Sequence, residues 1–327
     1  MKIWFEALLG MPSIEAERWH RLDLVSRWLV ATRAAVFAMT FLSCALAGLF
    51  ALQAGRFEPI RFGLLCVGLT LAHATNNILN DVSDHQRGVD KDNAFRTRYG
   101  TQPVEEGLMT VRQARLWALW TALPALGCGV VLCWLMGWAV LPFFLIGIAL
   151  VFGYNWPLKH YGLGEPMVVL VWGPLMVGGG YLSITGDWSW PVALASVPYA
   201  LGPTTVLFGK HIDKIPWDKP RGVRTLPVLL GQATARATTL VLVALQYLMT
   251  LALVVHGTVG WPVLCVFLAA PFVGRLWSVY RQPTPVGPPR GYPGGVWPLW
   301  YSAHAFVHFR RFGVLFVLGV AAGIAVF

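Results

Sequence analysis

Apolar residues in this chain gather in long blocks, and the polar residues fall mainly between the blocks. Nine blocks are long enough to cross the hydrocarbon core of a bilayer as helices, which takes about 20 residues each. They cover residues 34–54, 60–82, 113–136, 138–155, 165–184, 191–212, 234–256, 261–280 and 312–327. The pattern predicts an all-α, polytopic membrane protein of nine transmembrane helices.

The segment before the first block has a different pattern. Charged side chains there are mixed with apolar ones, among them Trp19 and Trp28. Such a mixture is typical of an amphipathic helix that lies at a membrane interface. We expect residues 1–33 to form a cytoplasmic interfacial segment and residues 34–327 to form a single intramembrane domain.

The composition agrees with this organisation. Hydrophobic residues make up 56% of the chain and charged residues only 12%, which leaves too few polar side chains for a water-facing surface of ordinary size. A soluble two-domain enzyme and a large extramembrane domain are therefore excluded. The five cysteines all lie inside apolar blocks without the spacing of metal ligands, so we interpret them as packing residues.

The formal net charge is +10, and the positions of the basic residues along the chain explain this excess. In the nine-helix topology, 23 of the 25 Lys and Arg residues fall on the face that holds the N-terminus. Cytoplasmic loops retain basic residues, so the excess indicates a cytoplasmic N-terminus and no nucleic-acid partner. Most acidic residues share this face. A basic loop needs no carboxylates to set topology, so this is where we expect the chemistry.

The second apolar block ends in a polar stripe. His73, Asn77, Asn80 or Asp81, and Asp84 recur with helical spacing, so they share one side of the helix. Exposure of these groups to lipid would be costly, and they must face a cavity or a partner. A stripe of hydrogen bonds between packed helices is the alternative for a single Asn or His.

The sixth block ends in a second acidic motif. Asp213 and Asp218 are followed by the cations Lys219, Arg221 and Arg224. Four predicted helices separate this motif from the first one. The arrangement indicates two four-helix halves in parallel orientation, followed by a ninth helix.

Together the two motifs indicate one kind of ligand. Mg²⁺ is held in proteins by a few carboxylates together with substrate phosphates, and Arg and Lys bind the remaining phosphate oxygens. A membrane-embedded cavity beneath such groups implies a hydrophobic tail. The residues therefore predict Mg²⁺ as cofactor and a lipid diphosphate as ligand.

The motif pair resembles the aspartate-rich motifs of the UbiA-type intramembrane prenyltransferase superfamily. It reads Asn77-x2-Asn80-Asp81-x2-Asp84-x3-Gly88-x-Asp90 and Asp213-x4-Asp218-x3-Gly222-x-Arg224-Thr225-Leu226. The first motif and the segment from Tyr154 to Glu165 are most similar to the 1,4-dihydroxy-2-naphthoate polyprenyltransferase branch. The second motif departs from that branch, because Gly209 to Ile212 replace its Asn-Asn-x-Arg run and the two aspartates lie one residue further apart.

The resemblance implies a set of site residues. Asp81, Asp84 and Asp90 would hold one Mg²⁺ and Asp213 and Asp218 a second, with all but Asp90 also expected to be catalytic. The expected diphosphate-binding residues are Lys159, Arg221, Arg224, Asn77, Asn80, Lys91 and Lys210. Independently of the resemblance, an allylic cation needs a closed apolar pocket with aromatic faces, and the expected substrate-pocket residues are Tyr154, Trp156, Trp172 and His211. No single residue is marked as the base that removes a proton from an acceptor, and a spare carboxylate or His211 are the options.

The expected function is transfer of a prenyl group from an isoprenyl diphosphate to a small aromatic acceptor, similar to a quinone precursor, in a bacterial plasma membrane. Two other functions stay open. A UbiA-type terpene cyclase would ionise the same diphosphate without an acceptor. A cation-coupled transporter would instead place its acids near the bilayer midplane and show inverted repeats.

Overall fold

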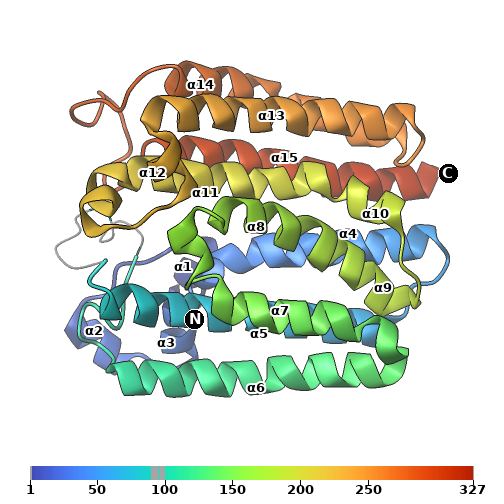
Figure 1. Cartoon of the computed structure of the whole chain (residues 1–327), viewed down its shortest axis with the longest axis horizontal. Coiled ribbons are helices and arrows are strands. Elements are labelled where there is room, and N and C mark those ends of the chain that lie inside the picture. Colours follow the sequence, from blue (N-terminus) through green and yellow to red (C-terminus); the bar gives the residue numbers. More distant parts are fainter. Residues whose placement is uncertain (1, 90–94, 96–99, 327) are drawn as a thin grey trace.

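The computed structural model describes residues 2–89, 95 and 100–326, and all regular elements in these ranges are helical. The longer helices run side by side along the long axis of the molecule (Figure 1). The first group comprises α4 (Phe37–Gln53), α5 (Pro59–Gln86), α6 (Val111–Met136) and α7 (Leu141–Gly153). The middle group comprises α8 (Gly164–Leu170), the π-helical segment η5 (Val171–Gly178), α9 (Gly179–Thr185), α10 (Trp190–Ala195) and α11 (Val197–Asp218). The last group comprises α12 (Leu226–Leu230), α13 (Gln232–Val255), the 3₁₀ segment η7 (Trp261–Ala269), α14 (Ala270–Tyr280) and α15 (Tyr301–Val326). Short 3₁₀ turns are η1 (Ala34–Val36), η3 (Gly137–Ala139), η4 (Leu158–Tyr161) and η6 (Lys219–Arg221).

The all-α membrane fold is confirmed, with a difference in the helix count. Within the described ranges, eight helical segments are long and apolar enough to cross a bilayer. The expected helix over 138–155 contains only the 13-residue α7, preceded by η3. The last helix starts at Tyr301 rather than at residue 312. Its first turns carry His304, His308 and two arginines, which interrupt the apolar pattern that the sequence analysis relied on.

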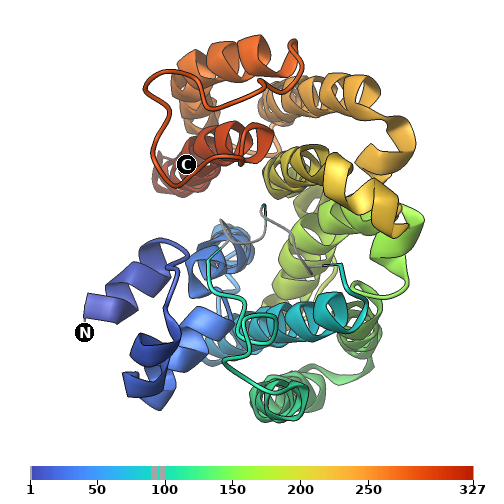
Figure 2. The ribbon, with the colours of Figure 1, turned by 90° about the vertical axis from the view of Figure 1, so that its left-hand side faces the viewer.

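The last helix links the first and middle groups. α5 contacts α4 and α6 within the first group, and α11 of the middle group contacts α13 of the last group. α15 packs along α11 and also touches α4, so it connects the groups (Figure 2). The aromatic rings of Phe309, Phe312 and Phe316 on α15 are fully enclosed in the largest buried cluster. Because α15 holds the groups together in this way, the C-terminal ends of α5 and α11 border the same interior cavity.

A distorted segment in the middle of the chain shapes that space. Pro174 lacks a backbone N–H, and the chain around it forms the π-helical η5 in place of an ordinary α-helix. The Ser43 hydroxyl on α4 donates to the carbonyl oxygen of Trp172 at 3.0 Å. On the other side, a Cβ at Gly173 would lie only 3.0 Å from the Cβ of Ala200 on α11. These contacts hold η5 between α4 and α11, with the Trp172 side chain turned toward the interior.

The N-terminal segment folds onto the same end of the bundle as the acidic motifs. It forms three short helices, α1 (Lys2–Leu9), α2 (Ala16–Arg21) and α3 (Leu24–Ala31), where the sequence analysis expected one. Asp23 is the N-cap residue of α3. Its side chain accepts a hydrogen bond from the Ser26 backbone N–H at 2.9 Å, which stabilises the start of this helix. The hydrogen bonds from Ser26 lower the pKa of the Asp23 carboxyl. Trp19 is buried in a cluster with Ile78 and Val82 of α5, so this segment packs on the end of α5.

Candidate active site

One large cavity lies between α5, η5, α11 and the start of α15. Its volume is about 1350 Å³ and most of its wall is apolar. Seven of the residues expected to bind substrate lie in this wall, and they come from four separate segments of the chain. They are Asn77 and Asn80 of α5, Tyr154 and Lys159, Trp172 of η5, and Lys210 and His211 of α11. The structure thus brings the ends of the two motif-bearing helices to a single cavity.

The wall changes character along the helices. On α5 the lining begins with Leu64 and Leu69 and ends with Asn76, Asn77 and Asn80, a distance of about 24 Å at the helical rise. On α11 the lining likewise passes from apolar side chains at 203–207 to Lys210 and His211. The cavity is therefore apolar at one end and rich in amides and cations at the other.

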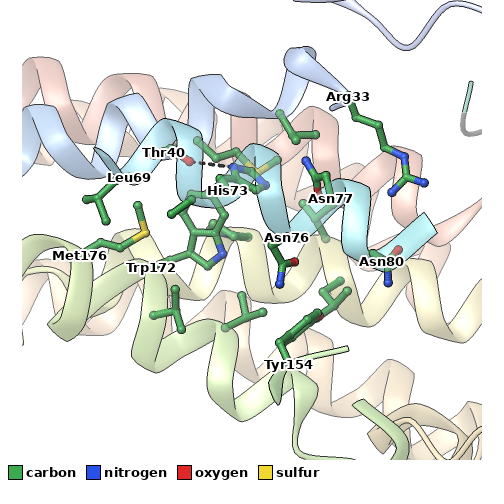
Figure 3. A pocket seen from close by; sticks show the side chains of 18 of the residues that line it. Arg33, Thr40, Leu69, His73, Asn76, Asn77, Asn80, Tyr154, Trp172 and Met176 are labelled. Atoms are coloured by element: carbon green, nitrogen blue, oxygen red, sulfur yellow. Dashed lines mark hydrogen bonds between the residues drawn. The ribbon is translucent and has the colours of Figure 1, made fainter. Parts of the chain in front are cut away.

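The predicted polar stripe on α5 both lines the cavity and joins the helices (Figure 3). His73 shares a hydrogen bond of 2.8 Å with Thr40 and meets the ring of Trp172 edge-on. The Asn77 amide donates to the carbonyl oxygen of Thr32 at 2.8 Å, and the Asn80 amide donates to Asn155 at 2.8 Å. Because these bonds satisfy part of each amide, the remaining polar atoms are held in fixed directions.

Asp84 continues this stripe and forms a buried ion pair. The Lys159 ammonium donates to both of its carboxylate oxygens at 2.9 Å. The side chain of Lys159 is 6% exposed and that of Asp84 is 1% exposed. In this buried, low-dielectric environment, loss of either charge would leave the other one uncompensated. Lys159 also reaches the cavity wall, so this pair connects the first motif with the segment between α7 and α8.

Asp81, three residues earlier, is buried on the same side of α5. One of its oxygens accepts a hydrogen bond from the Val104 backbone N–H at 3.1 Å. Its other oxygen lies 3.9 Å from the guanidinium of Arg33, which also lines the cavity. Arg33 is a site residue that was not expected from the sequence, in which it is one of the many basic residues on the N-terminal face.

Asp213 of the second motif has a structural role. Its carboxylate accepts hydrogen bonds from the backbone N–H groups of Tyr301 and Ser302, both at 2.9 Å, and from the Ser302 hydroxyl at 2.7 Å. The two backbone N–H groups belong to the first turn of α15 and have no partner within their own helix. Asp213 therefore anchors the start of α15, and both of its oxygens are engaged there.

Asp218 is separated from Asp213 by the geometry of α11. The helix continues through both residues, and five positions place them about 140° apart around its axis. Four positions before Asp218 stands Lys214, whose ammonium lies 3.1 Å from the carboxylate. Both side chains are 1% exposed. Each carboxylate has a different protein partner, which favours separate roles for Asp213 and Asp218; the expectation that they share one metal ion remains a prediction. The spacing of Lys214 and Asp218 was visible in the sequence and could have indicated their pairing.

A second buried pair faces the cavity from α11. The Nδ1 atom of His211 lies 2.5 Å from a carboxylate oxygen of Glu165, at the start of α8. Both side chains are almost fully enclosed, at 2% and 1% exposure. The other oxygen of Glu165 accepts from the Leu226 N–H at 3.4 Å. Glu165 was not expected as a site residue, because its partner lies 46 residues away along the chain.

Several other candidates lie outside the cavity wall. Trp156 is 47% exposed and stacks under the guanidinium of Arg87 at 3.8 Å, so it does not line the pocket as expected. Arg221 and Arg224 are exposed on the segment after α11. Asp90 and Lys91 lie outside the described residues.

The carboxylates allow a limited metal site. Within the described residues there is no cluster of three or more His, Cys, Asp or Glu side chains that could hold a metal ion. Mg²⁺ needs only one or two protein carboxylates when a substrate supplies phosphate oxygens. Asp81 and Asp84 lie on one side of α5 and could supply such carboxylates, with both oxygens of Asp84 bound to Lys159 here. A metal site at Asp213 and Asp218 remains a prediction.

Comparison with known proteins agrees with the geometry. The model of the UbiA prenyltransferase family matches residues 41–302, which is most of the chain. The chain belongs to this family. It is therefore a multi-pass membrane protein of the UbiA prenyltransferase family.

Curated relatives of this UbiA family member include enzymes with different acceptors. It is 28% identical to the 2-carboxy-1,4-naphthoquinone phytyltransferase of Synechocystis sp. over 42% of its own length, and it spans only 46% of that relative. It is 24% identical to the 1,4-dihydroxy-2-naphthoate octaprenyltransferase of Haemophilus influenzae, covering 65% of this chain and 71% of the relative. It is 25% identical to the digeranylgeranylglyceryl phosphate synthase of Natronomonas pharaonis, covering 75% and 83%. The naphthoate enzymes among these relatives support the branch indicated by the first motif.

Solved structures match over most of the chain. A UbiA homolog from Aeropyrum pernix K1 aligns with a TM-score of 0.64 and 17% identity, over 89% of this chain and 98% of that one. A UbiA homolog from Archaeoglobus fulgidus bound to GPP and Mg²⁺ aligns with a TM-score of 0.56 and 16% identity, over 91% and 99%. These matches confirm the fold.

Proposed function

We propose that this protein transfers a prenyl group from an isoprenoid diphosphate to a small aromatic acceptor of the quinone-precursor type, inside the membrane and with the help of Mg²⁺. The observation that carries the proposal is the change in the cavity wall along α5 and α11, from apolar side chains to amides and cations. A ligand that matches such a wall has a long apolar tail and a polyanionic head. A prenyl diphosphate has this form.

The head would lie where the ends of α5 and α11 meet. Asn77 and Asn80 offer amide groups there, and Lys159 and Lys210 offer ammonium groups on the same wall. Cations that are held in place and shielded from water stabilise the charge that develops on a departing diphosphate. Roles for Arg221, Arg224 and Lys91 in binding the same group remain predictions.

Asp81 and Asp84 would hold the Mg²⁺ ion, and a role for Asp90 beside them remains a prediction. When bound, the ion would neutralise part of the diphosphate charge and so ease cleavage of the allylic C–O bond. On α11, Lys214 would supply a fixed positive charge in place of a second metal ion. This assignment follows from its buried contact with Asp218 and from the engagement of Asp213 with α15.

The apolar part of the cavity has two tasks. It holds the prenyl tail, and it keeps water away from the allylic cation until the acceptor attacks. Trp172 and Tyr154 present aromatic faces to the cavity, and such faces stabilise a nearby cation. We assign the acceptor to the region near Lys210 and His211.

The relatives support an aromatic acceptor, since the names of two of those described above specify naphthalene-ring compounds. We further propose that the N-terminus and the active-site loops face the cytoplasm of a bacterial cell and that the enzyme resides in the plasma membrane. The one-sided distribution of Lys and Arg supports this orientation.

The test is release of pyrophosphate by purified protein with Mg²⁺ and a series of prenyl diphosphates, each with and without 1,4-dihydroxy-2-naphthoate. Products are identified by mass spectrometry. Acceptor-dependent release with an acceptor-plus-prenyl mass supports the proposal. Release without acceptor that yields a cyclic terpene would instead identify a cyclase. No release under any condition would refute both.

A further inference from the structure

The pair formed by His211 and Glu165 has no part in binding the diphosphate, yet it faces the cavity. A carboxylate oxygen can only accept a hydrogen bond, so the Nδ1 atom of His211 must donate at the observed 2.5 Å. When the ring is neutral, this leaves the lone pair on its Nε2 atom. His211 lines the cavity, so Nε2 is the ring atom left to act on a ligand there.

The surroundings of Glu165 hold it in place for this task. Its second oxygen accepts from the N–H of Leu226, which is the last residue of the second motif and begins α12. The side chain is 1% exposed, so water does not compete for the contact. A buried carboxylate in fixed contact with an imidazole stabilises the imidazolium that forms when the ring takes up a proton.

Two other histidines and a tyrosine in the described cavity wall are less suited to accept a proton. His73 and His304 also line the cavity, but their Nδ1 atoms bond to the Thr40 hydroxyl and to the Trp300 carbonyl oxygen, neither of which carries a charge. Burial raises the pKa of Tyr292 to about 12, so it stays protonated at neutral pH. His211 is distinguished from these groups by its carboxylate partner.

We propose that His211 is the general base of the transfer reaction and that Glu165 is its positioning residue. This proposal rests on the prenyl transfer proposed above. The allylic C–O bond breaks, and its electron pair leaves with the diphosphate. A π electron pair of the acceptor ring then forms the new C–C bond to the allylic carbon. The Nε2 atom removes the proton from that ring carbon, and the C–H electron pair restores the aromatic ring.

This assignment makes His211 necessary for transfer but not for ionisation. We expect His211→Asn, which retains a donor toward Glu165, to lower the rate of acceptor-dependent transfer about 100-fold or more, as for the loss of other general bases. Any Mg²⁺-dependent hydrolysis of prenyl diphosphate that is measured without acceptor should fall by a smaller factor than transfer does. Glu165→Gln should show the same separation with a smaller loss.

An isotope measurement separates a chemical role from a structural one. With acceptor deuterated at the attacked carbon, we expect wild-type protein to give a rate ratio near one, because ionisation limits the rate. In His211→Asn, proton removal should become limiting and raise the ratio. The matched control is His308→Asn, which removes another buried, hydrogen-bonded histidine that lies away from the cavity wall. It should keep the wild-type ratio.

The outcomes are distinct. A high isotope ratio in His211→Asn, together with a loss of transfer that is larger than the loss of hydrolysis, supports the proposal. Equal losses of hydrolysis and transfer, or an unchanged isotope ratio, would overturn it and assign His211 a structural role. Failure of the proposed function itself would be evident earlier, as the absence of any acceptor-dependent product from the wild-type protein.

Discussion

Lys159 donates to both carboxylate oxygens of Asp84, and this contact ties the segment between α7 and α8 to the end of α5. Neither residue is accessible from outside, although both belong to the expected diphosphate site. The charges needed for catalysis are thus also part of what holds the polar end of the cavity together. This dual role determines how variants of the two residues should behave.

We predict that Asp84→Asn and Lys159→Met each lower the free energy of unfolding by about 3–5 kcal/mol, because each leaves a buried charge without its partner. The double variant should regain most of this stability and remain inactive. Thermal unfolding in detergent measures the effect. Arg56→Met, which breaks an exposed ion pair with Asp187, is the control and should change little. Additive losses in the double variant would contradict the account.

Asp213 should behave as an anchor for α15. We predict that Asp213→Ala lowers the free energy of unfolding by about 2 kcal/mol, near the upper end for loss of an N-terminal cap, and leaves the number of bound metal ions unchanged. Unfolding and metal binding are both measured, with Asp187→Ala as a control at an exposed aspartate. Unchanged stability together with loss of a bound ion would show that Asp213 is a metal ligand.

Lys214 should determine how many metal ions are bound. We predict that wild-type protein binds a single Mn²⁺ ion per chain in the presence of inorganic pyrophosphate, as counted by electron paramagnetic resonance. Lys214→Asp replaces the ammonium by a carboxylate four positions from Asp218 and should add a second ion. Lys219→Asp, at a neighbouring exposed position, is the control. Two ions in the wild-type protein would refute the role assigned to Lys214.

The apolar end of the cavity should set the length of the prenyl chain. Ala72 lines the cavity between the apolar and polar parts of α5. We predict that Ala72→Phe fills the space beyond it and shifts the preference toward shorter prenyl diphosphates, as measured by relative kcat/KM. Val67→Phe places the same ring on the exposed side of α5 and should leave the preference unchanged. A uniform loss for all lengths in Ala72→Phe would argue against this path for the tail.

The sequence revealed the features that depend on local spacing. The stripe from His73 to Asp84 follows the helical period, so its common direction could be predicted and Asn77 and Asn80 indeed line the cavity. Hydropathy likewise predicted the all-α fold. It overestimated the length of the helix expected over residues 138–155, because a continuous apolar pattern does not show where an α-helix gives way to a 3₁₀ turn.

The features that depend on distant parts of the chain could not be predicted. The partners of Asp213 are backbone groups 88 and 89 residues further on, and no sequence period links them. Glu165 and His211 meet only because α8 packs on α11. Trp156 was placed in the pocket by its type alone, and the turn that follows α7 directs it outward.

The most direct test of the account is a structure determined with Mg²⁺ and a non-hydrolysable prenyl thiodiphosphate. The account predicts that the diphosphate lies among Asn80, Lys159 and Lys210, with a single metal ion at Asp81 and Asp84 and the prenyl tail along α5 toward Leu64. A diphosphate bound elsewhere, or a tail directed away from the apolar end of the cavity, would contradict it.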